Sequence, residues 1–227
     1  MREYMLKHVL IIPDGNRRYA EKKNIDMPVV YKLISDDITT KLIKYLIIDK
    51  NIKEMSFFAI SRDNVLKRTG KDLDPILDAQ VKAYEDWLKT DALTKNVTFK
   101  FIGDLDLLPK EYVKVALKLQ EKTKKNKNGT LNILTAYDGR WEIREASKKA
   151  AEKNDLSENA FEKYLLIKTP IDLIIRTGGE KRFSTCPIYQ SAYSELVFLD
   201  KFYPELTSDV LDGILKDYES RHRRFGK

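Results

Sequence analysis

The loop at residues 14–18 carries residue types that bind phosphate groups and divalent cations. A short apolar run ends at Ile12, and the chain then reads Asp14-Gly15-Asn16-Arg17-Arg18 before a helical pattern begins. Backbone N–H groups at a helix N-terminus attract phosphate, and Arg18 adds a charged fork. Asp14 supplies the kind of oxygen that Mg²⁺ uses beside substrate phosphates. Taken alone, the Asp-Gly pair is more simply explained as a turn with solvated arginines.

A second candidate segment, residues 171–184, combines an apolar run with glycines and arginines. It reads IDLIIRTGGEKRFS, so the run leads directly into Arg176 and then into a glycine pair. Glycines let a ligand approach the backbone closely, and Arg176, Arg182 and Ser184 have the donors to bind a second diphosphate. A glycine-rich loop with surface arginines is the alternative. Glu195 precedes a further apolar run and is a candidate second metal ligand, although such carboxylates are more often surface residues.

Both segments adjoin apolar runs that predict buried strands. The runs are continuous rather than alternating, which is typical of parallel strands covered on both faces. They lie at residues 9–12, 55–60, 97–102, 131–136, 171–175 and 195–199. Ligands bind beyond the carboxyl ends of parallel strands. We therefore expect the polar loops that begin at Asp14, Ser61, Tyr137 and Arg176 to meet at one rim.

Helical patterns separate the strands. Apolar residues recur at helical spacing in residues 38–48, 77–88, 110–122, 141–153 and 208–221. Strands that alternate with helices predict an α/β fold with a mostly parallel six-stranded sheet and helices on both faces. No shift in composition marks a second domain, so we expect a single domain over residues 1–227.

The composition narrows the classes of protein to consider. Charged residues make up 34% of the chain, and no stretch approaches the roughly 18 apolar residues of a membrane span. The N-terminus has no apolar signal region, and Cys186 is the single cysteine, so we expect a cytoplasmic protein without an intrachain disulfide. The net charge of +7 suits an anionic partner, although scattered lysines also describe a solvated surface. The lysine-rich run at 118–127 precedes an Asn-Gly turn, which favours an exposed helix end over a nucleic-acid patch.

The ordered motifs resemble those of the cis-prenyltransferases, the family of undecaprenyl diphosphate synthase. The family's first motif occurs as HVLIIPDGNRRYA at residues 8–20, and its signature I-R-T-G-G-E-x-R-x-S occurs at residues 175–184. Further matches are Ser61-Arg62-Asp63-Asn64, Ile102-Gly103-Asp104, Tyr137-Asp138-Gly139-Arg140-Trp141, Tyr193-Ser194-Glu195-Leu196 and Arg223-Arg224-Phe225-Gly226. Because several long motifs follow in the correct order over nearly the whole chain, the resemblance is specific.

The resemblance implies a Mg²⁺-dependent enzyme that condenses isopentenyl diphosphate with an allylic diphosphate and forms a Z double bond. Asp14 would be the catalytic acid and metal ligand, Glu195 would help to place the metal, and Asn64 would lie near the reacting carbons. The residues that would hold the allylic diphosphate are Gly15, Asn16, Arg17 and Arg18. Those that would hold isopentenyl diphosphate are Arg176, Arg182 and Ser184. Members are usually homodimers, and Arg224 and Gly226 would complete the site of the neighbouring subunit.

The resemblance also implies a hydrophobic tunnel, because water would quench a developing allyl cation. Candidates for its wall are Leu42, Leu46, Leu77, Val81 and Leu88, for each of which core packing is the simpler explanation. Tyr84 and Trp87 would close its end, which favours a short to medium product. Peripheral contact with a membrane during product release is a further expectation, and a nucleic-acid partner is not expected.

Departures from the family pattern cluster around the allylic half. Met27 stands where the family has an arginine, and Val30-Tyr31 stands where it has a Gly-His pair. The arginine expected shortly after Asn64 falls on Lys67 or Arg68. The histidine and arginine are also changed in lavandulyl-type synthases, which join two units branch-wise. Branched coupling therefore stays open beside head-to-tail condensation.

Other functions also stay open. A non-catalytic scaffold subunit would typically lack the first-loop aspartate, whereas Asp14 is present. A nucleic-acid-binding protein would present a contiguous Lys/Arg face, and no motif supports one. Prenyl transfer to an acceptor other than isopentenyl diphosphate is a third alternative. Retention of Arg176, Arg182 and Ser184 favours an acceptor that carries a diphosphate.

Overall fold

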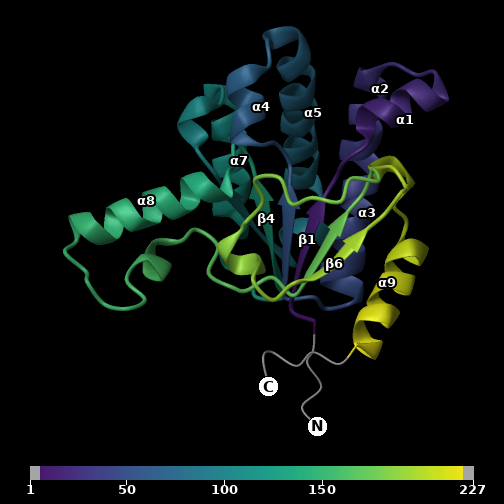
Figure 1. Cartoon of the computed structure of the whole chain (residues 1–227). Helices are drawn as coiled ribbons and strands as arrows, with labels where there is room; N and C mark the ends of the chain where they lie inside the picture. The colour runs from purple at the N-terminus through teal and green to yellow at the C-terminus, as the bar shows by residue number, and fades with distance from the viewer. Residues whose placement is uncertain (1–5, 222–227) are drawn as a thin grey trace.

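A six-stranded sheet in the order β3-β4-β2-β1-β5-β6 forms the centre of the chain (Figure 1). The computed structural model describes residues 6–221. The strands are β1 (His8–Ile12), β2 (Glu54–Phe58), β3 (Val97–Ile102), β4 (Gly129–Leu134), β5 (Leu173–Arg176) and β6 (Glu195–Phe198). Each neighbouring pair is parallel, so the carboxyl ends share one edge. The predicted parallel sheet is confirmed.

Helices connect the strands. They are α1 (Asn16–Lys23), α2 (Met27–Leu33), α3 (Thr39–Ile43), α4 (Arg62–Lys67), α5 (Gly70–Lys89), α6 (Asp91–Thr94), α7 (Lys110–Thr123), α8 (Gly139–Glu152) and α9 (Ser208–Ser220). The π-helical turn η1 (Ile34–Ile38) joins α2 to α3, and a second one, η2 (Lys44–Asp49), continues the same run after α3. This run begins well before the predicted helix at residues 38–48. Single 3-10 turns follow at η3 (Leu105–Leu107), η4 (Phe161–Tyr164), η5 (Tyr189–Ser191) and η6 (Tyr203–Glu205).

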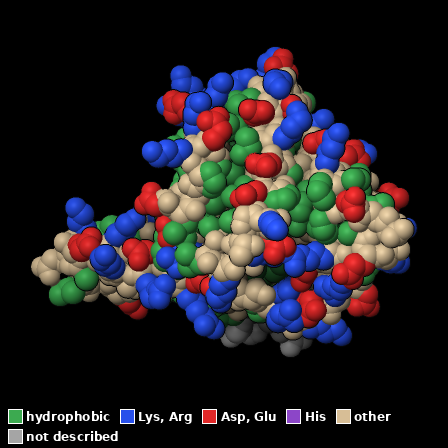
Figure 2. Space-filling view, turned by 90° about the horizontal axis from the view of Figure 1, so that it is seen from above, with side chains coloured by type: hydrophobic (Ala, Val, Ile, Leu, Met, Phe, Trp, Pro, Cys, Tyr) green, Lys and Arg blue, Asp and Glu red, His purple; other side chains and the backbone are tan. Residues whose placement is uncertain are grey.

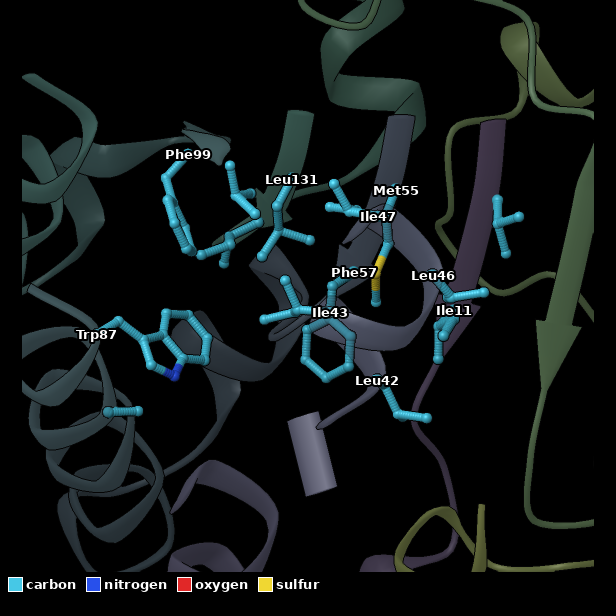
Figure 3. Packing of buried hydrophobic residues seen from close by; sticks show 14 of the residues in the cluster. Ile11, Leu42, Ile43, Leu46, Ile47, Met55, Phe57, Trp87, Phe99 and Leu131 are labelled. Atoms are coloured by element: carbon cyan, nitrogen blue, oxygen red, sulfur yellow. The ribbon is translucent and has the colours of Figure 1, made fainter. Parts of the chain in front are cut away.

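The larger hydrophobic core lies on the face of the sheet that α3, α5, α7 and α9 cover. Figure 3 shows Met55, Phe57 and Leu131 from the strands beside side chains of α3 and α5, among them Ile43 and Trp87. The Trp87 ring of α5 lies 5.4 Å from the Phe99 ring of β3, centroid to centroid. Removing apolar surface of this size from water stabilises the fold by roughly 1.5–3 kcal/mol for each large side chain.

The opposite face of the sheet is covered in part by segments outside the helices. Its smaller core joins Leu10 and Ile174 from the strands to Ile167, Ile171 and Cys186. The last three lie outside strands and helices, and α8 leads away from the sheet (Figure 1). Within residues 6–221, no helix is both long enough and apolar enough to cross a membrane.

Candidate active site

A cavity of 590 Å³ opens at the carboxyl edge of the sheet. Its mouth is polar, with Asp14 and Arg176 at the ends of β1 and β5 and Arg18 in the first turn of α1. Phe57 and Ile133 of the sheet line its interior. Figure 2 views the molecule from this edge and shows hydrophobic side chains gathered among charged ones. A charged mouth over an apolar interior suits an amphiphilic ligand with an anionic head.

Asp14 is fixed at the mouth through both its backbone and its side chain. Its N–H donates to Thr177 Oγ1 at 2.9 Å, and its carbonyl accepts from the Tyr203 N–H at 3.0 Å. Its Oδ1 accepts from the Gly15 N–H at 2.6 Å, and its Oδ2 accepts from Arg176 Nη2 at 2.8 Å. The side chain is still 32% exposed, so its oxygens can reach a ligand from solvent.

The turn after Asp14 requires glycine and opens α1 toward the cavity. Gly15 has φ +95°, and a Cβ there would lie 2.6 Å from the Phe202 ring. The α1 N-terminus has no side-chain cap, which leaves backbone N–H groups for an anion. Arg18 donates to the Gly178 carbonyl at 2.7 Å and lies 5.7 Å from the centre of the Phe202 ring. These contacts hold positive charge beside the helix terminus.

Arg176 is buried to 4% exposure and holds the second half of the mouth. Beyond Asp14, its Nη1 donates to Ser184 Oγ at 3.0 Å and to the Arg182 carbonyl. Its Nε is buried with no hydrogen-bond partner among the described residues. A buried donor without a partner is unusual in folded proteins and indicates a ligand site here.

Most of the predicted site residues meet at the cavity. Those that line it are Asp14, Gly15, Asn16, Arg17, Arg18, Asn64, Arg176 and Ser184. The Arg182 guanidinium does not line it but is exposed and contacts Glu180. Arg224 and Gly226 lie outside the described residues.

Glu195 lies at the opposite edge of the sheet from Asp14. In the β5–β6 register, Glu195 pairs with Leu173, whereas Arg176 pairs with Phe198. Glu195 is therefore three residues along the strand direction from the position that faces Arg176, which corresponds to a distance of roughly 10 Å. Its carboxylate instead contacts Arg221 at 2.7 Å. The structure therefore does not bring the two predicted metal ligands together within one chain.

The residues at the cavity mouth are compatible with a metal ion whose ligands come mainly from the substrate phosphates. Residues 6–221 contain no group of three or more His, Cys, Asp or Glu side chains placed to hold a metal ion. Mg²⁺, however, is commonly bound through one or two carboxylates together with substrate phosphates and water. The partly exposed Asp14 carboxylate, set among arginines, provides that kind of ligand.

Arg68 and Tyr31 extend the site beyond the predicted set. Arg68 lines the cavity, whereas Lys67 pairs with Asp63 at 2.7 Å in solvent. Arg68 stands four residues after Asn64, and residues four apart lie on the same face of a helix. This spacing could have favoured Arg68 over Lys67 from the sequence alone. Tyr31 also lines the cavity, and Met27 does not.

The tunnel wall uses a different set of residues from the one predicted. None of Leu42, Leu46, Leu77, Val81 and Leu88 lines the cavity; all five belong to the core or pack against it. The cavity-facing residues of α5 are Ile76, Ala79, Gln80, Ala83, Tyr84 and Trp87. Tyr84 and Trp87, which were predicted to close the end of the tunnel, are among these lining residues. Trp87 is anchored by a 2.8 Å hydrogen bond from Nε1 to Thr40 Oγ1.

The loop after β4 meets the Ser61 loop at the rim, as predicted, because the Arg62 N–H donates to the Tyr137 carbonyl at 2.9 Å, but its own residues do not line the cavity. Tyr137 is buried and donates its hydroxyl to Glu142, also buried, at 2.5 Å. The Asp138 carboxylate caps α8 by accepting from the Trp141 N–H at 2.7 Å. This loop therefore serves packing and helix capping.

A parallel sheet whose loops place arginines and an aspartate at the mouth of a cavity with an apolar interior is typical of enzymes that bind amphiphilic ligands with an anionic head. The family described as putative undecaprenyl diphosphate synthase matches residues 12–226. The chain belongs to this family of prenyltransferases, as the sequence motifs predict.

Individual relatives support the assignment over nearly the full chain. The chain is 38% identical to the tritrans,polycis-undecaprenyl-diphosphate synthase (geranylgeranyl-diphosphate specific) of Pyrobaculum aerophilum, over 97% of this chain and 95% of that protein. It is 35% identical to the ditrans,polycis-undecaprenyl-diphosphate synthase ((2E,6E)-farnesyl-diphosphate specific) of Micrococcus luteus, over 97% and 91%. The crystal structure of lavandulyl diphosphate synthase from Lavandula x intermedia, in complex with dimethylallyl diphosphate, is similar with a TM-score of 0.87 and 27% identity, over 97% and 98% of the two chains.

Proposed function

We propose that the protein is a Mg²⁺-dependent enzyme that condenses isopentenyl diphosphate with an allylic diphosphate to give a Z-configured prenyl diphosphate of short to medium length. The observation that carries the proposal is the ion pair between Asp14 and Arg176 at the mouth of a cavity with an apolar interior. It joins the two anion-binding loops, and each loop has donors for its own diphosphate.

The allylic diphosphate binds at the α1 N-terminus. Backbone N–H groups and Arg18 meet the negative charge that develops as the diphosphate leaves. Arg17 and Arg68 line the same mouth and add charge. Asp14 would hold Mg²⁺, which supplies further positive charge to the leaving group when bound.

Isopentenyl diphosphate binds on the Arg176 side. The Arg176 guanidinium and the Ser184 hydroxyl present donors to its phosphates. Arg182, whose exposed guanidinium contacts Glu180 in the structure, is proposed to turn toward the same diphosphate when it binds. Asn64 lies across the cavity wall on α4, and it is proposed to stand near the reacting carbons. The apolar interior excludes water from the allyl cation as the new bond forms.

The aromatic side chains in the α5 wall of the cavity support a product of short to medium length. Trp87 and Tyr84 close the α5 side, and their rings contact each other at a centroid distance of 5.5 Å. A volume of 590 Å³ lies in the range of sites for drug-sized ligands, roughly 300–1,000 Å³. The names of the curated relatives above indicate undecaprenyl products, so product length is the sharpest point on which this chain would differ from them.

Branched coupling is the second candidate. It is supported by the likeness to lavandulyl diphosphate synthase and by the changed residues Met27 and Tyr31. A cavity that accepts two short allylic units would serve this reaction as well. The position of the new carbon–carbon bond in the product distinguishes the two reactions.

The proposal includes a cytoplasmic homodimer that touches a membrane when the product leaves. The edge strand β6 supports the dimer, because Tyr193 and Leu196 expose apolar surface there at 65% and 37%. In a dimer, the C-terminal Arg224 and Gly226 are proposed to complete the neighbouring site. Light scattering of the purified protein tests the oligomeric state, and vesicle sedimentation tests the membrane contact.

The reaction is tested with the purified chain, Mg²⁺, labelled isopentenyl diphosphate and allylic primers of increasing length. The expected result is chain extension, with Z double bonds identified by NMR of the product. Branched products would establish the second candidate, and products of undecaprenyl length would contradict the short tunnel. Turnover by this chain alone excludes a scaffold role, whereas absence of turnover with every primer contradicts the proposed function.

A further inference from the structure

Gln80 places an amide group in the otherwise apolar α5 wall of the cavity. The residues of α5 that line the cavity run from Ile76, nearer the start of the helix, to Trp87, nearer its end. The mouth lies at the start of α5, because Asp72 there contacts Arg17 at 3.2 Å. With a helical rise of about 1.5 Å per residue, Gln80 lies roughly 6 Å beyond Ile76 and roughly 10 Å before Trp87. The Gln80 amide therefore lies in the α5 wall between Ile76 and the aromatic residues Tyr84 and Trp87.

A buried hydrogen-bond network fixes the orientation of this amide. The Tyr112 hydroxyl lies 2.8 Å from Gln80 Oε1 and 2.9 Å from both the Tyr84 hydroxyl and Thr135 Oγ1. A carbonyl oxygen can only accept, so Tyr112 donates its one proton to Gln80 and accepts from the other two hydroxyls. The Gln80 oxygen thus points into the protein.

The Gln80 nitrogen is bonded much more weakly than the oxygen. It lies 3.5 Å from the Ala59 carbonyl, at the outer limit of a hydrogen bond. Ala59 also lines the cavity, so this amide nitrogen and this carbonyl form one polar step in the wall. Reversing the amide would set its oxygen against the Ala59 carbonyl and remove the acceptor from Tyr112, which disfavours that orientation.

We infer that Gln80 is a specificity-determining residue that limits how far the product tail extends. A tail that stays above Gln80 leaves the amide N–H groups in contact with water. A tail that passes it covers these donors with hydrocarbon, which cannot accept a hydrogen bond. Gln80 therefore disfavours the additions that would carry the tail to Tyr84 and Trp87. This inference rests on the proposed function and adds to it a polar residue that selects product length.

The test is the product distribution of Gln80→Leu and Gln80→Met, each compared with the unsubstituted protein under the same primer and substrate ratio. Both variants keep a side chain of similar length and remove the amide. The expected result is a rise of roughly tenfold in the ratio of the next longer product to the main product, as expected for loss of one poorly paired polar group. Thermal unfolding identifies which variants are folded, and a folded variant of either kind is sufficient.

Gln120→Leu on α7 is the matched control. Gln120 Oε1 accepts from the Phe101 N–H at 3.1 Å, and the residue does not line the cavity. Its substitution is expected to lower stability and leave the product ratio unchanged. An unchanged ratio in folded Gln80 variants, or an equal shift in Gln120→Leu, would overturn the inference while leaving the proposed function intact. Absence of any prenyl product from the unsubstituted protein would overturn both.

Discussion

Arg176 Nη2 and Asp14 Oδ2 meet at 2.8 Å, although the two residues stand 162 positions apart in the chain. Their strands, β5 and β1, are neighbours in the sheet, and Arg176 pairs with Ile12 in the register. The carboxyl ends of two parallel strands thus deliver an acid and a guanidinium to one point. The pair fixes the distance between the two proposed diphosphate sites.

Arg176→Lys tests the isopentenyl half of that arrangement. Lysine keeps the charge but lacks the planar fork that binds Asp14 and Ser184 at once. We expect the KM for isopentenyl diphosphate to rise by roughly tenfold or more, as for loss of a charge-assisted hydrogen bond. The KM for the allylic primer should change less. Arg140→Lys, at an exposed α8 position away from the cavity, is the control; equal effects of both substitutions on KM would refute the assignment.

Tyr31→Phe tests a residue that stands where the family has histidine. Tyr31 lines the cavity, and within residues 6–221 its hydroxyl has no hydrogen-bond partner. A hydroxyl that bonds only to ligand should affect catalysis more than stability. We expect kcat/KM for the allylic primer to fall by roughly tenfold, the effect of one lost hydrogen bond, with the unfolding temperature nearly unchanged.

Tyr45→Phe is the control, because it is expected to affect stability rather than catalysis. Its hydroxyl donates to Asp212 at 2.5 Å, and the residue does not line the cavity. This substitution should lower the unfolding temperature and leave kcat/KM unaltered. If Tyr31→Phe behaves in the same way as Tyr45→Phe, Tyr31 has only a structural role.

The buried His8 predicts a loss of stability below neutral pH. Burial lowers the pKa of His8 from its usual 6.5, against an opposing effect of the Glu54 carboxylate. The ring is held by Ser56 at 2.8 Å and by Thr169 at 3.1 Å. Below pH 6.5 the unfolded chain therefore binds a proton that the folded chain does not, and stability falls as the pH is lowered.

Urea denaturation at pH 7.5 and pH 5.5 measures this effect. One histidine contributes at most about 1.4 kcal/mol to the free energy of unfolding for each pH unit. His8→Gln should show a smaller difference between the two pH values, whatever its absolute stability. An equal pH dependence in the variant would assign the loss to other groups.

The strands and most of the site could be predicted from the sequence because each depends on local pattern. Continuous apolar runs identify parallel strands, and residues that directly follow them reach the carboxyl edge. Asp14, Ser61 and Arg176 all line the cavity for this reason. The predicted metal-ligand role of Glu195 went against the same rule, because the first residue of a parallel strand lies at the opposite edge from the carboxyl ends.

The residues of the tunnel wall could not be predicted because α5 has apolar residues on two neighbouring parts of its surface, one against the core and one against the cavity. Leu77 packs in the core, whereas its neighbour Ile76 lines the cavity. Helical periodicity identifies such a broad face but does not separate the part against the core from the part against a ligand. That division depends on where the sheet and the run α2–η2 leave space, which is set by long-range packing. Arg182 illustrates the same limit, because only its carbonyl points toward Arg176.

The central claim is that Asp14 acts in catalysis at the junction of two diphosphate sites, and Asp14→Ala tests it most directly. Steady-state turnover of the variant is measured with saturating Mg²⁺ beside the binding of isopentenyl diphosphate and the allylic primer by calorimetry, with circular dichroism to verify folding. We predict a loss in kcat of roughly 10³-fold, comparable to removal of a main transition-state contact, and a much smaller change in substrate binding. Turnover close to that of the unsubstituted protein would contradict the account.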